Sequence, residues 1–258
     1  KVLAVMESLR NIAIVAHVDH GKTTLVSQLM EQTETGKRTG VSELDNNALE
    51  KERGITILAK NTAITWDGVK INLVDTPGHA DFSGEVERIL SMVDAVLVVV
   101  DSVEGPMPQT RYVTEMALAN DLYPIVVVNK CDRPAARPFW VLDQTFDLFV
   151  QLGASDNQLD FPAIFCSAIE GYARLDPQDN NMDMHVLLNI IKDKVPAPIA
   201  KEGPLQMQIS ALDYSDYVGT IGIGKVLRGK VSRNTTVEVL NGTIKPRRAK
   251  INDVLGYS

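Results

Sequence analysis

Apolar residues follow two alternating patterns along the first three quarters of the chain. Short runs in which nearly every position is apolar, such as residues 95–100, indicate strands that are covered on both faces. Longer stretches between them have apolar residues every three or four positions, which indicates helices with one buried face. In residues 85–93, for instance, the apolar positions repeat at i, i+3, i+4 and i+7. The alternation predicts an α/β domain with a mostly parallel sheet and helices on both of its faces.

These patterns predict the individual elements of that domain. Asp67-Gly68 between two strands is a strong signal for a two-residue hairpin. The expected sheet therefore has six strands, at residues 11–16, 57–66, 69–75, 95–101, 123–128 and 161–166. Helices are expected from residue 24 onward and at residues 85–93, 108–120, 138–153 and 184–195.

The pattern changes after residue 196. We expect a first domain at residues 1–196, an extended proline-rich linker at 197–204 and a β-domain at 205–258. Four strands without closure would leave exposed edges, so we expect this chain to contain only the start of a β-barrel. The expected strands are residues 205–212, 220–227, 235–240 and 247–254, with Asn241-Gly242 as a hairpin turn.

Composition narrows the class of protein. The chain has 258 residues, of which 45% are hydrophobic and 23% charged, and the net charge is −7. This acidic balance argues against DNA binding by bulk electrostatics, and the apolar runs are too short to span a bilayer. Two cysteines are too few for a disulfide scaffold, which favours a reducing, cytoplasmic compartment. We also expect a monomer. Met6 is a possible natural start, with residues 1–5 preceding it.

Residues 16–23 fit the phosphate-loop pattern G-x-x-x-x-G-K-[ST], except that Ala16 holds the first glycine place. In such a loop, backbone N–H groups surround phosphate oxygens and Gly21 lets the backbone come close. Lys22 would neutralise the β- and γ-phosphates, and the Thr23 hydroxyl would bind Mg²⁺. Taken alone, the run could also be a glycine-containing turn that caps a helix.

A second motif follows the expected strand at residues 69–75. Asp75 can hold Mg²⁺ through water, and Gly78 can offer its N–H group to the γ-phosphate. His79 stands where a side chain could orient an attacking water, either as a base or only by positioning it. Thr56, in the polar stretch before this motif, can complete the Mg²⁺ shell as part of a switch segment.

The third motif, Asn-Lys-Cys-Asp at residues 129–132, concerns the base. Asp132 can accept hydrogen bonds from guanine N1–H and the 2-amino group, and adenine lacks that donor pair. Asn129 would tie the loop together and contact the base, and Lys130 would lay its stem along the ring. Backbone N–H groups at Ser167 and Ala168 could reach the guanine oxygen.

With these motifs in place, the sequence resembles the translational GTPases of the elongation-factor class. The phosphate loop, the Arg-Gly-Ile-Thr run ending at Thr56 and the Asp-Thr-Pro-Gly-His run ending at His79 are together typical of that class. The resemblance is closer to the BipA/TypA family than to elongation factor G or LepA. The runs that carry it are residues 45–64, 79–88, 105–111 and 138–160. It covers nearly the whole chain, and full-length members have further C-terminal domains.

The resemblance implies a ribosome-associated factor that binds GTP or GDP and hydrolyses GTP with Mg²⁺. It implies that His79 moves toward the water when the ribosome docks, screened by the apolar pair Val18 and Ile55. Asp19 would help to position His79 or a cation, so the implied catalytic residues are His79, Lys22 and Asp19. The implied metal ligands are Thr23, Thr56 and, through water, Asp75. The implied GTP contacts are Asp19, His20, Gly21, Lys22, Thr23, Thr24, Gly78, Asn129, Lys130, Asp132, Ser167 and Ala168.

Three questions stay open at this level. The chain could be a GTP-dependent binding switch in which hydrolysis is incidental. It could be a P-loop ATPase, although Asp132 argues against adenine. A local group of basic residues could form an ordinary solvated strand face or contact RNA phosphates; its members are Lys245, Arg247, Arg248 and Lys250.

Overall fold

The computed structural model describes residues 8–33, 60–76, 83–199, 201–242 and 244–256. Four of the expected site residues lie outside these ranges, and their roles stay predictions. They are Ile55, Thr56, Gly78 and His79. The chain divides into two compact units, residues 1–198 and residues 199–258.

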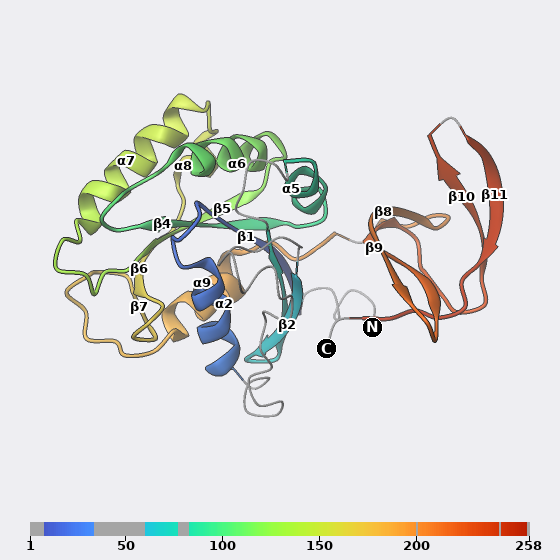
Figure 1. The fold of residues 1–258 in the computed structure, drawn as a ribbon, viewed down its shortest axis with the longest axis horizontal. Coiled ribbons are helices and arrows are strands. Elements are labelled where there is room, and N and C mark those ends of the chain that lie inside the picture. Colours follow the sequence, from blue (N-terminus) through green and yellow to red (C-terminus); the bar gives the residue numbers. More distant parts are fainter. Residues whose placement is uncertain (1–7, 34–59, 77–82, 200, 243, 257–258) are drawn as a thin grey trace. The chain divides into compact units, whose positions relative to one another are not determined.

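The first unit is built on a seven-stranded sheet (Figure 1). Its central strands run parallel, and one antiparallel strand pairs at each edge. From edge to edge the strands are β2 (Lys60–Trp66), β3 (Val69–Asp75), β1 (Leu9–Ala16), β4 (Ala95–Asp101), β5 (Tyr123–Asn129), β6 (Ala163–Ser167) and β7 (Tyr172–Arg174).

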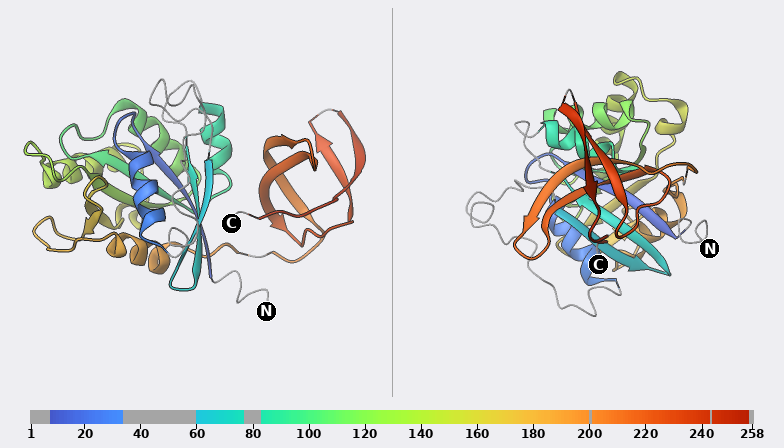
Figure 2. Two further views of the ribbon diagram at one scale, coloured as in Figure 1. Left: turned by 60° about the horizontal axis from the view of Figure 1, so that its bottom comes forward. Right: turned by 90° about the vertical axis from the view of Figure 1, so that its right-hand side faces the viewer.

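Helices cover both faces of this sheet, as the apolar periodicity predicts (Figures 1 and 2). One face carries α2 (Lys22–Glu31) and α9 (His185–Lys194). The other carries α5 (Ser83–Leu90), α6 (Pro108–Ala119), α7 (Pro138–Gln151) and the single-turn α8 (Asp156–Leu159).

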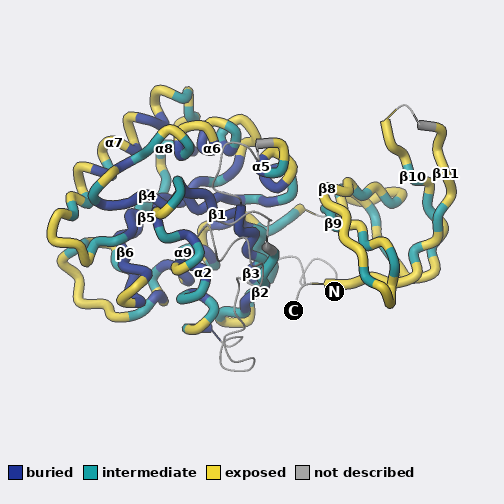
Figure 3. The backbone as a smooth tube through the Cα atoms, viewed as in Figure 1, coloured by how far each residue is buried: buried dark blue, intermediate teal, exposed yellow. Residues whose placement is uncertain are grey.

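The core has two apolar layers, one on each side of the sheet. The strands of this sheet contain many of the buried residues of the unit (Figure 3). Alternate residues of β4 enter different layers: Leu97 packs toward α2 and α9, and Val98 packs toward α5, α6 and α7. Every residue of β4 is buried. Each fully buried aliphatic side chain contributes about 1.5–3 kcal/mol, so β4 is a rigid support for whatever follows its carboxyl end.

The hairpin between β2 and β3 turns at Asp67-Gly68, as expected. Both residues have positive φ, 48° and 75°, and Trp66 stands opposite Val69 in the register. These dihedrals are those of the two-residue turns that match the twist of antiparallel strands.

The expected sheet of six strands was wrong by one, because β7 was missed. β7 has three residues and α8 has four, too few to produce a periodic pattern. The helix expected at residues 85–93 ends at Leu90, although Val93 is buried. The predicted bounds of α6, α7 and α9, and the predicted start of α2, are each within about two residues of the observed ones.

The second unit consists of two antiparallel pairs. β8 (Gln206–Ser215) pairs with β9 (Gly219–Arg228), and β10 (Thr236–Asn241) pairs with β11 (Ile244–Lys250). The last strand was expected at 247–254, but the tight turn after Asn241 lets pairing begin at Ile244 and end at Lys250.

Large apolar side chains stay exposed on this unit. Leu212, Tyr214 and Leu240 are each at least 69% exposed. None of the helices in the described ranges of either unit has the length and apolar character that a bilayer-spanning helix requires.

Candidate functional site

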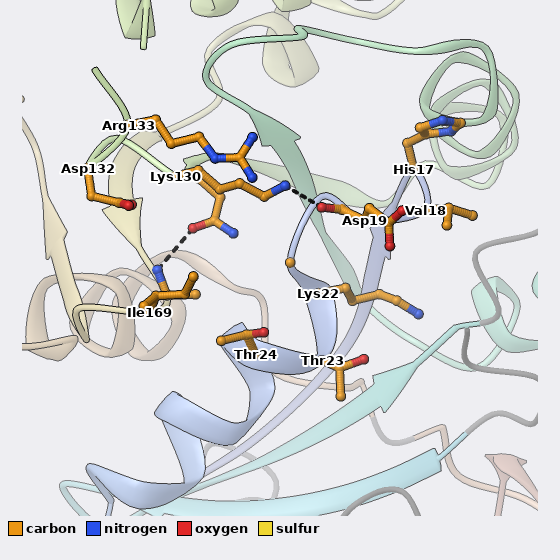
Figure 4. A pocket seen from close by; sticks show the side chains of 13 residues that line it. His17, Val18, Asp19, Lys22, Thr23, Thr24, Lys130, Asp132, Arg133 and Ile169 are labelled. Atoms are coloured by element: carbon orange, nitrogen blue, oxygen red, sulfur yellow. Dashed lines mark hydrogen bonds between the residues drawn. The ribbon is translucent and has the colours of Figure 1, made fainter. Parts of the chain in front are cut away.

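The parallel strands all point the same way, so their carboxyl ends lie side by side along one border of the sheet, across the strand direction. Polar or small residues end these strands: Asp75 on β3, Ala16 on β1, Asp101 on β4, Asn129 on β5 and Ser167 on β6. Ligands of open α/β sheets bind at this kind of edge. The structure has a pocket of about 320 Å³ here (Figure 4). Its lining residues are His17, Val18, Asp19, Gly21, Lys22, Thr23, Thr24, Asn129, Lys130, Asp132, Arg133, Ala168 and Ile169.

The loop between β1 and α2 forms one wall of this pocket. Asp19 and Gly21 both have positive φ, 64° and 90°. Gly21 has a second constraint, because a Cβ atom on it would clash with Asn129 Nδ2. Lys22 is the first residue of α2, so the helix N-terminus and its N–H groups face this loop, as an anion site requires.

Lys22 pairs with the carboxylate at the end of β3. Its Nζ lies 2.7 Å from Asp75 Oδ1 and also donates to the Thr76 carbonyl. Lys22 is 8% exposed and Asp75 is 6% exposed. The Thr76 hydroxyl donates to Ile14 O at 2.8 Å, which fixes the segment after β3 against β1. The structure thus brings Lys22 and Asp75 together. Two different sequence motifs had each predicted one of these residues at the phosphate end.

Asn129 ties three segments together. Its Nδ2 donates to His20 O at 2.9 Å, and its Oδ1 accepts the Ala168 N–H at 3.0 Å. These two bonds join the phosphate loop, the end of β5 and the segment after β6. The Ala168 N–H already has this partner, so a contact with a guanine oxygen would have to share it.

The base motif faces the phosphate loop across the pocket. Lys130 Nζ donates to the Asp19 carbonyl, which closes the pocket on one side (Figure 4). Asp132 lines the pocket and is exposed, so its carboxylate is accessible to a ligand. Thr23 and Thr24 line the opposite side at the start of α2.

Two of the expected GTP contacts have buried side chains. His20 and Ser167 are both 0% exposed and do not line the pocket. The Asp101 N–H donates to His20 Nδ1 at 3.3 Å, and His20 Nε2 lies 3.3 Å from Glu104 Oε2. Burial lowers the pKa of His20, which favours the neutral imidazole. Any contact of His20 with a ligand is therefore left to its main chain.

Four residues at this edge were missed at the level of the sequence. His17, Arg133 and Ile169 line the pocket, and Asp101 lies beneath it. A signal existed for Asp101, since it is an acidic residue that ends a wholly apolar strand. Arg133 directly follows the base motif, and that position was available as a hint.

Both cysteines lie in surroundings that disfavour the thiolate form. Burial raises the pKa of the Cys131 thiol to about 12 and that of Cys166 well above its usual value. Cys166 Sγ contacts Asn129 Oδ1 at 3.3 Å. Thiols held in their neutral form are poor nucleophiles. The contact of Cys166 with Asn129 instead gives this cysteine a part in packing at the loops.

Comparison with known proteins agrees with this geometry. Residues 7–197 match the family model described as "Elongation factor Tu GTP binding domain". The chain belongs to this family. All the residues that line the pocket lie within the matched range.

Curated relatives include the large ribosomal subunit assembly factor BipA of Salmonella typhimurium strain LT2, which is 61% identical over 256 residues. BipA of Haemophilus influenzae is 59% identical over 257 residues. Each alignment covers 98% of this chain and 42% of the relative, so the chain spans less than half the length of these proteins.

Solved structures of elongation factors share the fold. Translation elongation factor SelB of Methanococcus maripaludis, in complex with the GTP analogue GppNHp, matches with a TM-score of 0.69 and 24% identity. The alignment covers 93% of this chain and 46% of SelB. A bacterial selenocysteine-specific factor, EF-Sec, matches with a TM-score of 0.67, 21% identity and coverage of 93% and 40%.

Proposed function

We propose that this chain binds GTP and hydrolyses it to GDP and phosphate, and that a ribosome stimulates the reaction. The observation that carries the proposal is the bond between Asn129 Nδ2 and His20 O at 2.9 Å. It joins the guanine motif to the phosphate loop, so that one pocket has a base-recognition end and a phosphate end.

Guanine recognition falls to Asp132 at the base end. Its accessible carboxylate can accept two N–H groups that guanine offers and adenine does not. The Lys130 stem lies along one side of the pocket, held there by the bond to Asp19 O, where it can cover the ring. Competition by ATP and by unlabelled GTP against labelled GTP distinguishes a GTPase from a P-loop ATPase. Only unlabelled GTP should displace the label at comparable concentration.

Two oxygen-bearing side chains at the phosphate end support Mg²⁺ as the cofactor. The Thr23 hydroxyl and the Asp75 carboxylate are oxygen ligands of the kind that Mg²⁺ prefers. Among the described residues, no cluster of three or more His, Cys, Asp or Glu side chains could hold a metal by itself, which fits an ion held mainly by phosphate oxygens and water. When bound, Mg²⁺ neutralises charge on the β- and γ-phosphates. Thr56 would complete this set.

Lys22 supports the same assignment. Its charge is now balanced by Asp75, and a bound triphosphate would offer it a stronger anionic partner. We propose that Lys22 transfers from Asp75 to the phosphates, which releases the Asp75 carboxylate for its role at the metal.

Hydrolysis itself requires a positioned water. We propose that His79 orients this water and that Gly78 binds the γ-phosphate through its N–H group. Val18 and Ile55 would screen His79 until the ribosome docks. Asp19 is exposed at the pocket, which supports a role in positioning His79 or a cation.

The partner we propose is the ribosome, through its RNA, in the cytoplasm. The curated relatives are named large ribosomal subunit assembly factors, which supports this partner.

The four basic residues of β11 are exposed, but strand alternation puts Lys245 and Arg247 on one face of the hairpin and Arg248 and Lys250 on the other. Arg248 stands opposite Glu238, so the four do not form a single basic surface.

We also propose the domain plan that the sequence predicts: a GTPase domain at residues 1–196, a linker at 197–204 and the start of a β-barrel at 205–258. Two separate strand pairs with exposed apolar side chains support an incomplete barrel. Further strands in a longer protein would cover those side chains.

Ribosome pelleting tests the proposed partner. This chain and a full-length BipA relative are each centrifuged with ribosomes through sucrose in the presence of a non-hydrolysable GTP analogue, GDP or no nucleotide. We expect the full-length protein to pellet several-fold more with the analogue than with GDP, since the γ-phosphate orders the switch segment. Equal pelleting in all three conditions would contradict the GTP-dependent association. If pelleting depends on GTP but turnover is unaffected by ribosomes, the binding-switch alternative is favoured.

A further inference from the structure

A buried carboxylate lies at the end of β4, below the pocket. Asp101 is 0% exposed and belongs to none of the motifs that contact nucleotide by prediction. Its Oδ2 lies 2.8 Å from Lys130 Nζ and 3.3 Å from Arg133 Nη1. Its Oδ1 accepts the Val103 N–H at 2.7 Å and the Glu104 N–H at 3.4 Å. The two carboxylate oxygens therefore have different partners: Oδ2 pairs with two cationic side chains, and Oδ1 accepts two backbone N–H groups.

The cations on Oδ2 both come from the guanine-recognition loop. Lys130 is 13% exposed, and Arg133 is 47% exposed and lines the pocket. Burial alone would raise the pKa of Asp101, but the Lys130 bond and the backbone N–H groups outweigh it and lower the pKa. Asp101 therefore carries its negative charge where Lys130 needs a partner.

Lys130 needs such an anchor because of its backbone. Its φ is 65°, in the left-handed region that a side chain other than glycine seldom adopts. The Ser102 hydroxyl, next to Asp101, donates to Lys130 O at 2.8 Å, so the carbonyl and the ammonium group of Lys130 are bound by two successive residues, Ser102 and Asp101. Strained residues of this kind persist only where their surroundings hold them.

The same strand end reaches the phosphate loop. Lys130 Nζ, held by Asp101, also donates to Asp19 O. The Asp101 N–H donates to His20 Nδ1 at 3.3 Å. Asp101 therefore contacts both loops that the nucleotide must bridge, one through its carboxylate and one through its main chain.

We propose that Asp101 is a positioning residue for guanine-nucleotide binding, which holds Lys130 along the base and against the phosphate loop. Asp101 does not touch the nucleotide. Its effect passes through Lys130, so it acts at the base end and not at the γ-phosphate. GDP and GTP should therefore depend on it equally. This inference rests on the guanine-nucleotide site proposed above.

If Asp101 only stabilised the backbone after β4, the hydrogen bonds to its Oδ1 would matter and the ion pair at its Oδ2 would not. Asn in place of Asp101 keeps an oxygen that can accept the Val103 N–H and loses the negative charge that faces Lys130. Asp101→Asn therefore leaves the backbone contact in place and removes the ionic one. Asp94→Asn is the matched control, because Asp94 directly precedes the same strand and its Oδ2 accepts a hydrogen bond from Asn11 Nδ2 at 2.8 Å.

The experiment measures dissociation of fluorescent GDP and of fluorescent GTP by stopped flow, with single-turnover hydrolysis of GTP at a saturating excess of protein alongside. We expect Asp101→Asn to speed dissociation of both nucleotides by about 10- to 100-fold, with the two factors agreeing within about threefold. The single-turnover hydrolysis rate should stay within about twofold of wild type, because the γ-phosphate end is unchanged. Asp94→Asn should leave dissociation unchanged.

A double-mutant cycle tests the route through Lys130. Lys130→Met keeps the unbranched stem and removes the ammonium, so it should also speed dissociation, and adding Asp101→Asn should then have little further effect. Additive effects would overturn the proposal, as would unchanged dissociation in Asp101→Asn that only lowers the unfolding temperature. If Asp101→Asn does not fold, unchanged dissociation in Lys130→Met overturns the proposal, and faster dissociation of both nucleotides supports it. A wild-type chain that binds no GDP would instead contradict the guanine-nucleotide site itself.

Discussion

Replacing Asp132 with asparagine is expected to weaken GTP binding by about 10³-fold, because two hydrogen bonds to a charged acceptor are lost in the pocket. The asparagine amide would present a donor where guanine also presents donors. Xanthine has a carbonyl oxygen at the corresponding position, so the variant should gain affinity for xanthosine triphosphate. The structure places Asp132 on the pocket wall with its carboxylate accessible, which is the condition for this exchange of specificity.

Competition against fluorescent GDP measures this exchange, with GTP, xanthosine triphosphate and ATP as competitors. Asp143→Asn is the matched control, since Asp143 is an exposed carboxylate on α7 that does not line the pocket. The control should bind like wild type. An Asp132→Asn variant that keeps its GTP affinity within about threefold of wild type would remove Asp132 from guanine recognition.

The second large effect is expected for His79→Ala. GTP binding should be retained, and ribosome-stimulated hydrolysis should fall by about 10²–10⁴-fold, the range that a positioned proton-transfer or water-orienting group contributes. The measurement is phosphate release at saturating GTP with and without ribosomes, made on the full-length protein. His185→Ala is a suitable control, because His185 lies on α9 and packs its ring on Trp66. Unchanged stimulated turnover in His79→Ala would rule out the role assigned to His79.

Much of the fold was predictable because its elements are long and periodic. The central strand β4 is apolar at every position before Asp101, and the helices have one apolar stripe. The hairpin was predictable from Asp67-Gly68, since few other dipeptides adopt two positive φ angles in succession. β7 and α8 were not predictable, because tertiary contacts determine whether three or four residues pair or turn.

The site could be predicted only where a motif is contiguous in the sequence. Lys22, Asn129 and Asp132 each belong to such a motif, and the fold brings all three to one pocket. Asp101 and His17 were missed because their importance comes from neighbours on other elements. The burial of His20, whose ring turns toward Glu104, was missed for the same reason.

The central claim is that this pocket selects guanine and that a ribosome accelerates hydrolysis there. The most direct test is phosphate release from GTP and from ATP, each with and without ribosomes, by this chain and by a full-length BipA relative. We predict slow release from GTP alone, faster release with ribosomes for the full-length protein, and almost no release from ATP. Equal release from ATP and GTP, or release from GTP that ribosomes leave unchanged in the full-length protein, would contradict the claim.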